Sequence, residues 1–224
     1  MTESIQIDNQ NFIMHASGVF FWEERSMLLI SDVHLGKVSH FRKFGAAVPQ
    51  QAVKKNFESM NTAIQYFNTK TIVFMGDLFH SSLNKEWGLF EIWVTEQSSR
   101  LILVSGNHDI ISPLKYEELG IQVVEELILD NFLLTHHPEE RDGFFNICGH
   151  IHPAIKLTGL GRQTVRLACF YKSPIQLILP AFGEFTGTYT LQAKKDCEVF
   201  ALLGDAVLPV TLTESKRKGR SAKR

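Results

Sequence analysis

Short apolar runs of strand length recur along the first two thirds of the chain. They are rich in leucine, β-branched and aromatic side chains, and several have the near-continuous apolar character of strands buried on both faces. We predict strands at residues 27–30, 71–75, 101–104, 132–134 and 145–148.

Between the first three runs, the apolar residues take the spacing of amphipathic helices instead. Steps of four and three residues predict one helix through Val53, Phe57, Met60, Ile64 and Phe67, and a second through Leu83, Trp87, Phe90 and Val94. A serine–proline pair at 112–113 and Gly120 bracket a short third helix. The alternation of strand and helix favours a parallel-type α/β core.

After residue 120 the helical spacing fades and strand-like runs dominate. Residues 127–134 are typical of a hairpin that turns at Asp130-Asn131, and further runs lie at 164–170, 175–179, 188–191 and 199–203. An α/β half followed by a β-rich half indicates two packed sheets with helices outside.

Composition and charge exclude only a few classes of protein. The 224 residues are 44% hydrophobic and 21% charged, which excludes a disordered or collagen-like chain. The net charge of −1 hides six basic groups and no acid in residues 216–224. We predict one domain over residues 1–210 and a basic, disordered tail over 211–224. The tail fits a nucleic-acid-binding arm or a solubilising end, and both interpretations stay open.

The chain has none of the sequence signals of a membrane or secreted protein. No apolar run approaches the length of a membrane span, and the first residues lack the pattern of a signal peptide. The three cysteines are widely spaced and odd in number, which argues against a disulfide framework. A cytoplasmic protein without membrane association is expected.

Five polar clusters each follow directly after an apolar run. They are Asp32-x-His34, Gly76-Asp77-x-x-His80, Gly106-Asn107-His108-Asp109, Thr135-His136-His137-Pro138 and Gly149-His150-x-His152. Ligands of open α/β sheets bind beyond the carboxyl ends of the strands, so we expect one convergent site at a common edge.

The residue types in these clusters suit divalent transition metals, since they combine imidazoles with carboxylate and amide oxygens. Asp32 and His34, like His150 and His152, should share one face of an extended segment. The glycines at 76, 106 and 149 should free the backbone to approach an ion. Each cluster alone is more often a polar turn or a pair of surface histidines, whereas all five in this order predict a metal site.

The order of the clusters resembles that of the calcineurin-like metallophosphoesterases, from about Asp32 to His152. The similarity to one branch, the ligase-associated DNA damage response endonucleases (PdeM), extends over nearly the whole chain through residues 31–37, 41–49, 76–81 and 180–187. The resemblance implies an α/β fold in the form of a four-layer αββα sandwich of two packed mixed sheets.

The resemblance also implies two divalent metal ions, most simply manganese, with iron or zinc as alternatives. The first ion would be held by Asp32, His34, Asp77 and His152, and the second by Asp77, Asn107, His136 and His150. The role of His80 stays open, because many family members have aspartate or arginine there. We interpret His137 as a supporting group beside a ligand.

Hydrolysis would proceed by attack of a hydroxide that bridges the two metals on a phosphodiester. In this interpretation His108 protonates the leaving oxygen, and Asp109 orients the His108 imidazole. Lys37, Arg42 and Lys43 either hold a neighbouring phosphate of a polymer or lie on a solvated loop.

Three functions stay open. The resemblance favours a DNA-directed endonuclease or phosphodiesterase in DNA repair, associated with a DNA ligase, a helicase and a nuclease. The alternatives are a phosphatase or phosphodiesterase for nucleotides or lipid precursors, and an inactive scaffold. The scaffold predicts missing ligands, whereas this sequence has the complete set.

Overall fold

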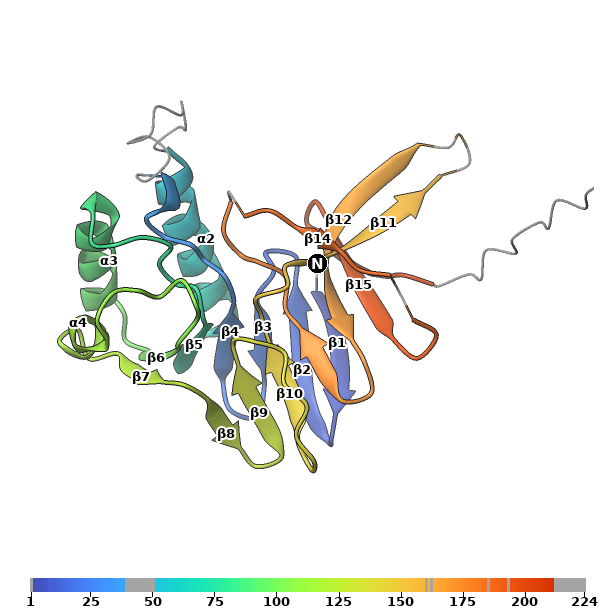
Figure 1. The fold of residues 1–224 in the computed structure, drawn as a ribbon, viewed down its shortest axis with the longest axis horizontal. Helices are drawn as coiled ribbons and strands as arrows, with labels where there is room; N and C mark the ends of the chain where they lie inside the picture. The colour runs from blue at the N-terminus through green and yellow to red at the C-terminus, as the bar shows by residue number, and fades with distance from the viewer. Residues whose placement is uncertain are drawn as a thin grey trace, which may run out of the picture.

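The computed structural model describes residues 2–38, 51–159, 161, 163–184, 186–192 and 194–211. Two β-sheets pack face to face, and the helices lie to one side (Figure 1). The predictions for Arg42, Lys43 and the stretch 41–49 lie outside the described residues, as does the tail from residue 212 onward.

The first sheet has seven strands whose order in space is their order in the chain. The first four are antiparallel and the last four, β4 to β7, run parallel. They are β1 (Thr2–Ile7), β2 (Gln10–His15), β3 (Phe20–Trp22), β4 (Met27–Ile30), β5 (Thr71–Met75), β6 (Arg100–Val104) and β7 (Gln122–Val124). The prediction missed β1 to β3 and β7. Of these, β1 and β2 mix exposed polar with buried apolar positions and so form no apolar run.

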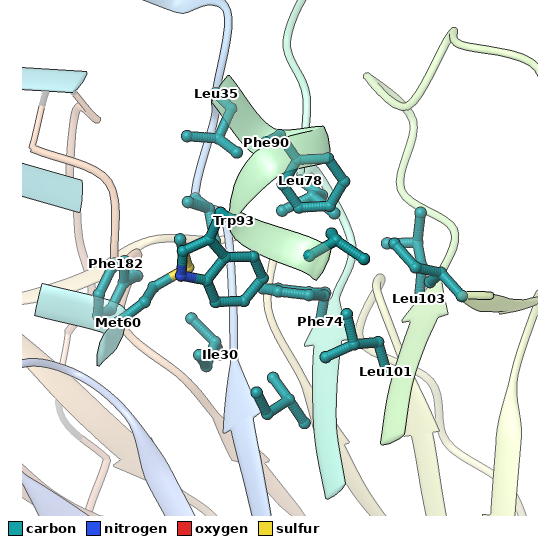
Figure 2. Packing of buried hydrophobic residues seen from close by; sticks show 14 of the residues in the cluster. Ile30, Leu35, Met60, Phe74, Leu78, Phe90, Trp93, Leu101, Leu103 and Phe182 are labelled. Atoms are coloured by element: carbon teal, nitrogen blue, oxygen red, sulfur yellow. The ribbon is translucent and has the colours of Figure 1, made fainter. Parts of the chain in front are cut away.

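In the described part of the chain, three helices cover the outer face of this sheet: α2 (Gln51–Phe67), α3 (Lys85–Thr95) and α4 (Pro113–Glu117). All three were predicted, but α3 begins after Leu83, because the Asn84 side chain accepts the Glu86 amide and caps the helix there. Figure 2 shows Trp93 of α3 packed against the strands and Met60 of α2. None of the described helices is long and apolar enough to cross a membrane.

The second sheet has nine strands and is also mixed, with β9, β10 and β13 parallel. Its strands are β8 (Leu127–Leu129), β9 (Phe132–Thr135), β10 (Phe145–Cys148), β11 (Pro153–Thr158), β12 (Thr164–Lys172), β13 (Gln176–Ile178), β14 (Tyr189–Thr190), β15 (Glu198–Leu203) and β16 (Ala206–Pro209). The predicted hairpin of residues 127–134 is present as β8 and β9.

A large core lies between the two sheets. Phe12 is fully buried there, and its ring centroid lies 4.9 Å from those of Phe20 and Trp22 and 5.4 Å from that of Phe132 on the second sheet. These aromatic contacts fix the two sheets against each other. The predicted pair of packed mixed sheets is therefore confirmed.

The outer face of the second sheet differs from the expected helical layer. In the part of the chain that the structure describes, all helices precede residue 118. A small cluster of strand and loop side chains takes their place, and we call it the cysteine cluster: Cys148, Ile155, Cys169, Tyr171, Ile178, Cys197, Val199 and Ala201. The three cysteines are free, as predicted. Residues after 120 lack helical spacing, which explains why strands supply this layer.

We expect Phe12→Ala to lower the free energy of unfolding by about 3–5 kcal/mol, because it leaves a cavity between the sheets. Urea denaturation measures the change. Ile128→Ala on β8 is the control: Ile128 is 45% exposed, so its loss should stay within about 0.5 kcal/mol. Equal losses for the two variants would contradict the aromatic contact as the link between the sheets.

Candidate metal centre

The five polar clusters follow strands of both sheets. Three come after β4, β5 and β6 of the first sheet, and two come after β9 and β10 of the second. Their side chains meet, so the clusters do form one site. The site lies between the strand ends of two sheets, however, whereas from the sequence we expected it at the edge of a single sheet.

One group of candidate ligands consists of Asp32, His34 and His152, whose ligand atoms all lie within 4.8 Å of one another. The Asp32 Oδ1 atom is 3.1 Å from His152 Nε2. Both atoms are buried, yet neither has a hydrogen-bond partner. Buried polar atoms are rarely left unpaired, and a cation between these two would satisfy both. The donor set therefore fits a metal ion.

A second group surrounds His136, which is buried. Its Nε2 atom lies 3.1 Å from Asn107 Oδ1, 3.2 Å from His150 Nδ1 and 3.4 Å from Asp77 Oδ1. The other Asp77 oxygen, Oδ2, is 3.3 Å from His34 Nε2. Asp77 thus stands between the two groups and presents one carboxylate oxygen to each.

The protonation states suit metal binding. Burial raises the pKa of Asp77, but the hydrogen bond to His34 and the charge of His136 outweigh burial and hold this pKa well below its usual range. Burial also raises the pKa of Asp32, but the combined interactions with His152, His136 and Ser31 outweigh burial and lower this pKa. Burial lowers the pKa values of His34 and His150. Ionised carboxylates and neutral imidazoles are the forms that bind metal.

The far nitrogen of three imidazoles is held by the protein. The Nδ1 atom of His136 lies 3.0 Å from the Met75 carbonyl, and that of His152 lies 3.0 Å from the Gly187 carbonyl. A carbonyl can only accept, so in both rings Nδ1 donates and Nε2 turns its lone pair toward the cluster. In His34, Nδ1 lies 2.9 Å from the Thr186 hydroxyl.

Residues 180–187 are the part of this site to which the sequence assigned no role. Their resemblance to the endonuclease branch was the only signal. The amides of Phe182 and Gly183 donate to the carbonyls of Ser31 and Asp32. The Phe182 side chain enters the core under the helices, beside Met60 (Figure 2). These contacts fix the loop that carries Thr186 and Gly187.

Five of the candidate ligands have left-handed backbone, with φ between 50° and 66°: Asp32, His34, Asp77, His150 and His152. The prediction of two extended segments with ligands on a shared face is therefore wrong. Each ligand instead leaves a tight turn just after its strand. Aspartate and histidine enter this region more readily than most residues, and the conformation is otherwise a mark of strain at functional sites.

The glycines leave space for ligand side chains. A Cβ atom on Gly76, whose φ is +82°, would lie 2.1 Å from His136 Nδ1. A Cβ on Gly149 would lie 1.8 Å from Ser31 Oγ, and one on Gly106 would lie 2.2 Å from Asp77 Oδ1. From the sequence we expected these glycines to let the backbone approach an ion. In the structure the space beside them is occupied by side chains of the site, namely His136, Asp77, Asp32 and Ser31.

The predicted partnership of His108 and Asp109 is not what the structure shows. Both Asp109 carboxylate oxygens accept backbone amides, from Phe79 at 3.0 Å and from Gly106 at 2.8 Å. Asp109 therefore shapes the loop and does not orient the imidazole. Burial raises its pKa to about 6, although the two amides oppose the shift. The His108 amide donates to Asp77 Oδ1 at 2.9 Å, and its side chain is exposed.

The three remaining candidates also lie at the site. The His80 ring is 4.2 Å from that of His108 and 5.2 Å from that of His34, measured between centroids. Burial, followed by the charges of His108 and His34, lowers the His80 pKa to about 4. His137 is exposed, with its ring 4.0 Å from that of His150. Burial lowers the pKa of Lys37, and the charges of Asp77 and Asp32 oppose this shift.

Comparison with known proteins finds two solved structures that are similar to this chain. The chain is similar to the solved Pseudomonas putida nuclease MPE, with 26% identity over 94% of this chain and 100% of that one, and a TM-score of 0.80. It also matches Yfce, a phosphoesterase from E. coli, with 13% identity over 82% of this chain and 97% of that one, and a TM-score of 0.40. No curated protein matches.

A protein-family model also matches the chain. Residues 26–175 match the calcineurin-like phosphoesterase family. This stretch is more than half of the chain, and it contains all five polar clusters. The family implies divalent metal, for which the clustered histidines and aspartates provide the donors. This protein therefore belongs to the calcineurin-like phosphoesterase family and is a metal-dependent phosphoester hydrolase.

Proposed function

We propose that this protein is a two-metal phosphodiesterase that cuts DNA. The observation that carries the proposal is the position of Asp77, whose two oxygens face two separate groups of donors. A carboxylate placed in this way can be shared by two ions, as a two-metal phosphodiesterase requires.

The proposed ligands follow from these distances. Asp32, His34 and His152 would hold the first ion together with Asp77, and Asn107, His136 and His150 would hold the second together with Asp77. When bound, such a pair of ions supplies an activated water at neutral pH and offsets charge on the phosphoryl oxygens. His137 lies beside the second group, and its ring contacts that of His150 in a tilted arrangement.

His108 is the proposed proton donor. Its backbone is fixed by the bond to Asp77, while its exposed imidazole is free to meet the leaving oxygen of a substrate. His80 packs against this imidazole and takes the positioning role that the sequence suggested for Asp109. Lys37, whose ammonium group is attracted by the carboxylates of Asp77 and Asp32, is the proposed contact to a substrate phosphate.

Similarity to a nuclease supports the choice of DNA. The likeness to the Pseudomonas putida enzyme covers all of that chain and nearly all of this one. Manganese as the metal, a cytoplasmic location, and a repair role beside a DNA ligase and a helicase rest on the resemblance to the endonuclease branch.

We expect the manganese-loaded enzyme to hydrolyse bis-p-nitrophenyl phosphate faster than p-nitrophenyl phosphate, since the proposed substrate is a diester. Release of nitrophenol measures both rates, and cleavage of a labelled single-stranded oligonucleotide then tests DNA. A preference for the monoester would favour a small-molecule phosphatase. Retention of metal without either activity would favour a scaffold.

We expect Asp77→Asn to lose metal and activity together, because the shared carboxylate loses its charge. His108→Ala should keep its metal while turnover falls by about 10²–10⁴-fold. Metal content by elemental analysis and turnover of the diester separate the two effects. A metal-free His108→Ala variant would contradict this division of roles.

Thr186→Val should weaken metal binding by about 10–100-fold, as expected when a ligand imidazole loses its hydrogen-bond partner. Titration of the metal-free protein with manganese measures the affinity. Thr190→Val, at an exposed position on β14, is the control and should bind like the unaltered protein. Equal affinities for both variants would show that the Thr186 hydroxyl does not position His34.

A further inference from the structure

We propose that the hairpin of β11 and β12 is a binding arm for the phosphate backbone of the nucleic acid that enters the metal centre. This inference rests on the proposed function and adds the surface that would hold a polymeric substrate. Figure 1 shows the hairpin extending away from the two packed sheets. It begins at Pro153, the residue directly after the candidate ligand His152.

The charge of this region differs from that of the rest of the chain. Residues 143–183 contain no aspartate or glutamate, although the whole chain has 24 acidic residues. The same stretch has four basic residues, Lys156, Arg162, Arg166 and Lys172. The hairpin is thus a cationic element on a protein that is otherwise acidic over its folded part.

Cross-strand pairing places two of these cations opposite each other. Lys156 on β11 pairs with Arg166 on β12, and both are exposed. Like charges directly opposite on one face of an antiparallel pair are destabilising. Among the residues that the structure describes, neither has a salt bridge to an acidic group. A bound anion would relieve the repulsion.

The base of the hairpin shows the contrasting arrangement. Lys172, at the end of β12, pairs across the sheet with Glu198 of β15 and forms a salt bridge with it. The chain therefore neutralises the cation near the body of the protein and leaves the two farther along the hairpin open to an external partner.

The neighbouring pairs fit phosphate as that partner. The next pair on the Lys156–Arg166 face is Thr158–Thr164, and both threonines are exposed. On the other face, Ile155 belongs to the cysteine cluster and Leu157 and Leu167 pack against it. One face is thus apolar and packed at Ile155, Leu157 and Leu167. The other offers ammonium, guanidinium and hydroxyl donors, the groups that contact nucleic-acid backbones.

The position along the strand gives the reach of the arm. Lys156 follows His152 by four residues, which corresponds to roughly 13 Å of extended strand. That length equals the rise of about four base-pair steps along the axis of duplex DNA. A polymer cut at the metal centre can contact this pair, whereas a dinucleotide or a nitrophenyl diester is too short.

The test compares two double variants that each remove one lysine and one arginine. Lys156→Gln/Arg166→Gln alters the hairpin, and Lys70→Gln/Arg100→Gln alters exposed positions at the opposite, amino ends of β5 and β6. A third variant, Lys156→Arg/Arg166→Lys, keeps both charges. Each manganese-loaded protein is assayed on a 30-nucleotide single strand at several salt concentrations, on a dinucleotide, and on bis-p-nitrophenyl phosphate.

For Lys156→Gln/Arg166→Gln we expect KM on the 30-mer to rise on the order of tenfold, and the slope of log KM against log salt to fall by about 1–2. Rates on the dinucleotide and on the nitrophenyl diester should not change. The charge-keeping exchange and the Lys70/Arg100 variant should match the unaltered enzyme. An unchanged KM and salt slope, or an equal effect at Lys70/Arg100, would overturn the inference.

The same assays distinguish failure of the proposed function from failure of the binding arm. An unaltered enzyme that hydrolyses the nitrophenyl diester but neither cuts nor binds the 30-mer would overturn DNA as substrate and the arm with it. An enzyme that cuts the 30-mer equally well with and without the hairpin cations would overturn the arm alone.

Discussion

The two sheets of this protein pack face to face over a core of aromatic and aliphatic side chains, and that packing brings the metal centre together. Asp32, Asp77 and Asn107 follow strands of the first sheet, whereas His136 and His150 follow strands of the second. Neither sheet alone has a complete set of donors. Burial of apolar surface, the main favourable term in folding, thus holds two sets of polar groups together.

This arrangement places unfavourable features where the chemistry occurs. Five candidate ligands have left-handed backbone, which costs about 1–3 kcal/mol at each position, and several charged or polar side chains are buried beside one another. Contacts of the loop at residues 180–187 offset this cost. Phe182 packs in the core under the helices, and Thr186 and Gly187 hold the Nδ1 atoms of His34 and His152. These contacts hold the imidazoles of His34 and His152 in position.

Charge is divided between two neighbouring regions. The carboxylates of Asp32 and Asp77 lie buried among imidazoles, in a group suited to cations. The exposed face of the β11–β12 hairpin, which starts one residue after His152, has only basic and hydroxyl side chains beyond its buried base. The phosphodiester polymer that we propose as substrate is an anion, and it would use one region for the reaction and the other for binding the chain.

The sequence alone determined the helices and strands whose apolar residues are regularly spaced, and it determined the residue types of the site. Runs such as 71–75 and the helical spacing of 53–67 predict structure because apolar positions must face a core, and all five polar clusters could be found because each follows such a run. Strands β1 and β2 could not be found in this way, since each exposes polar residues. Only the tertiary structure decided that two sheets share the site, that Asp109 binds backbone amides, and that Thr186 supports His34. The Phe79–Asp109 and His34–Thr186 contacts join residues 30 and 152 positions apart. Their partners depend on how distant segments pack, which no local pattern encodes.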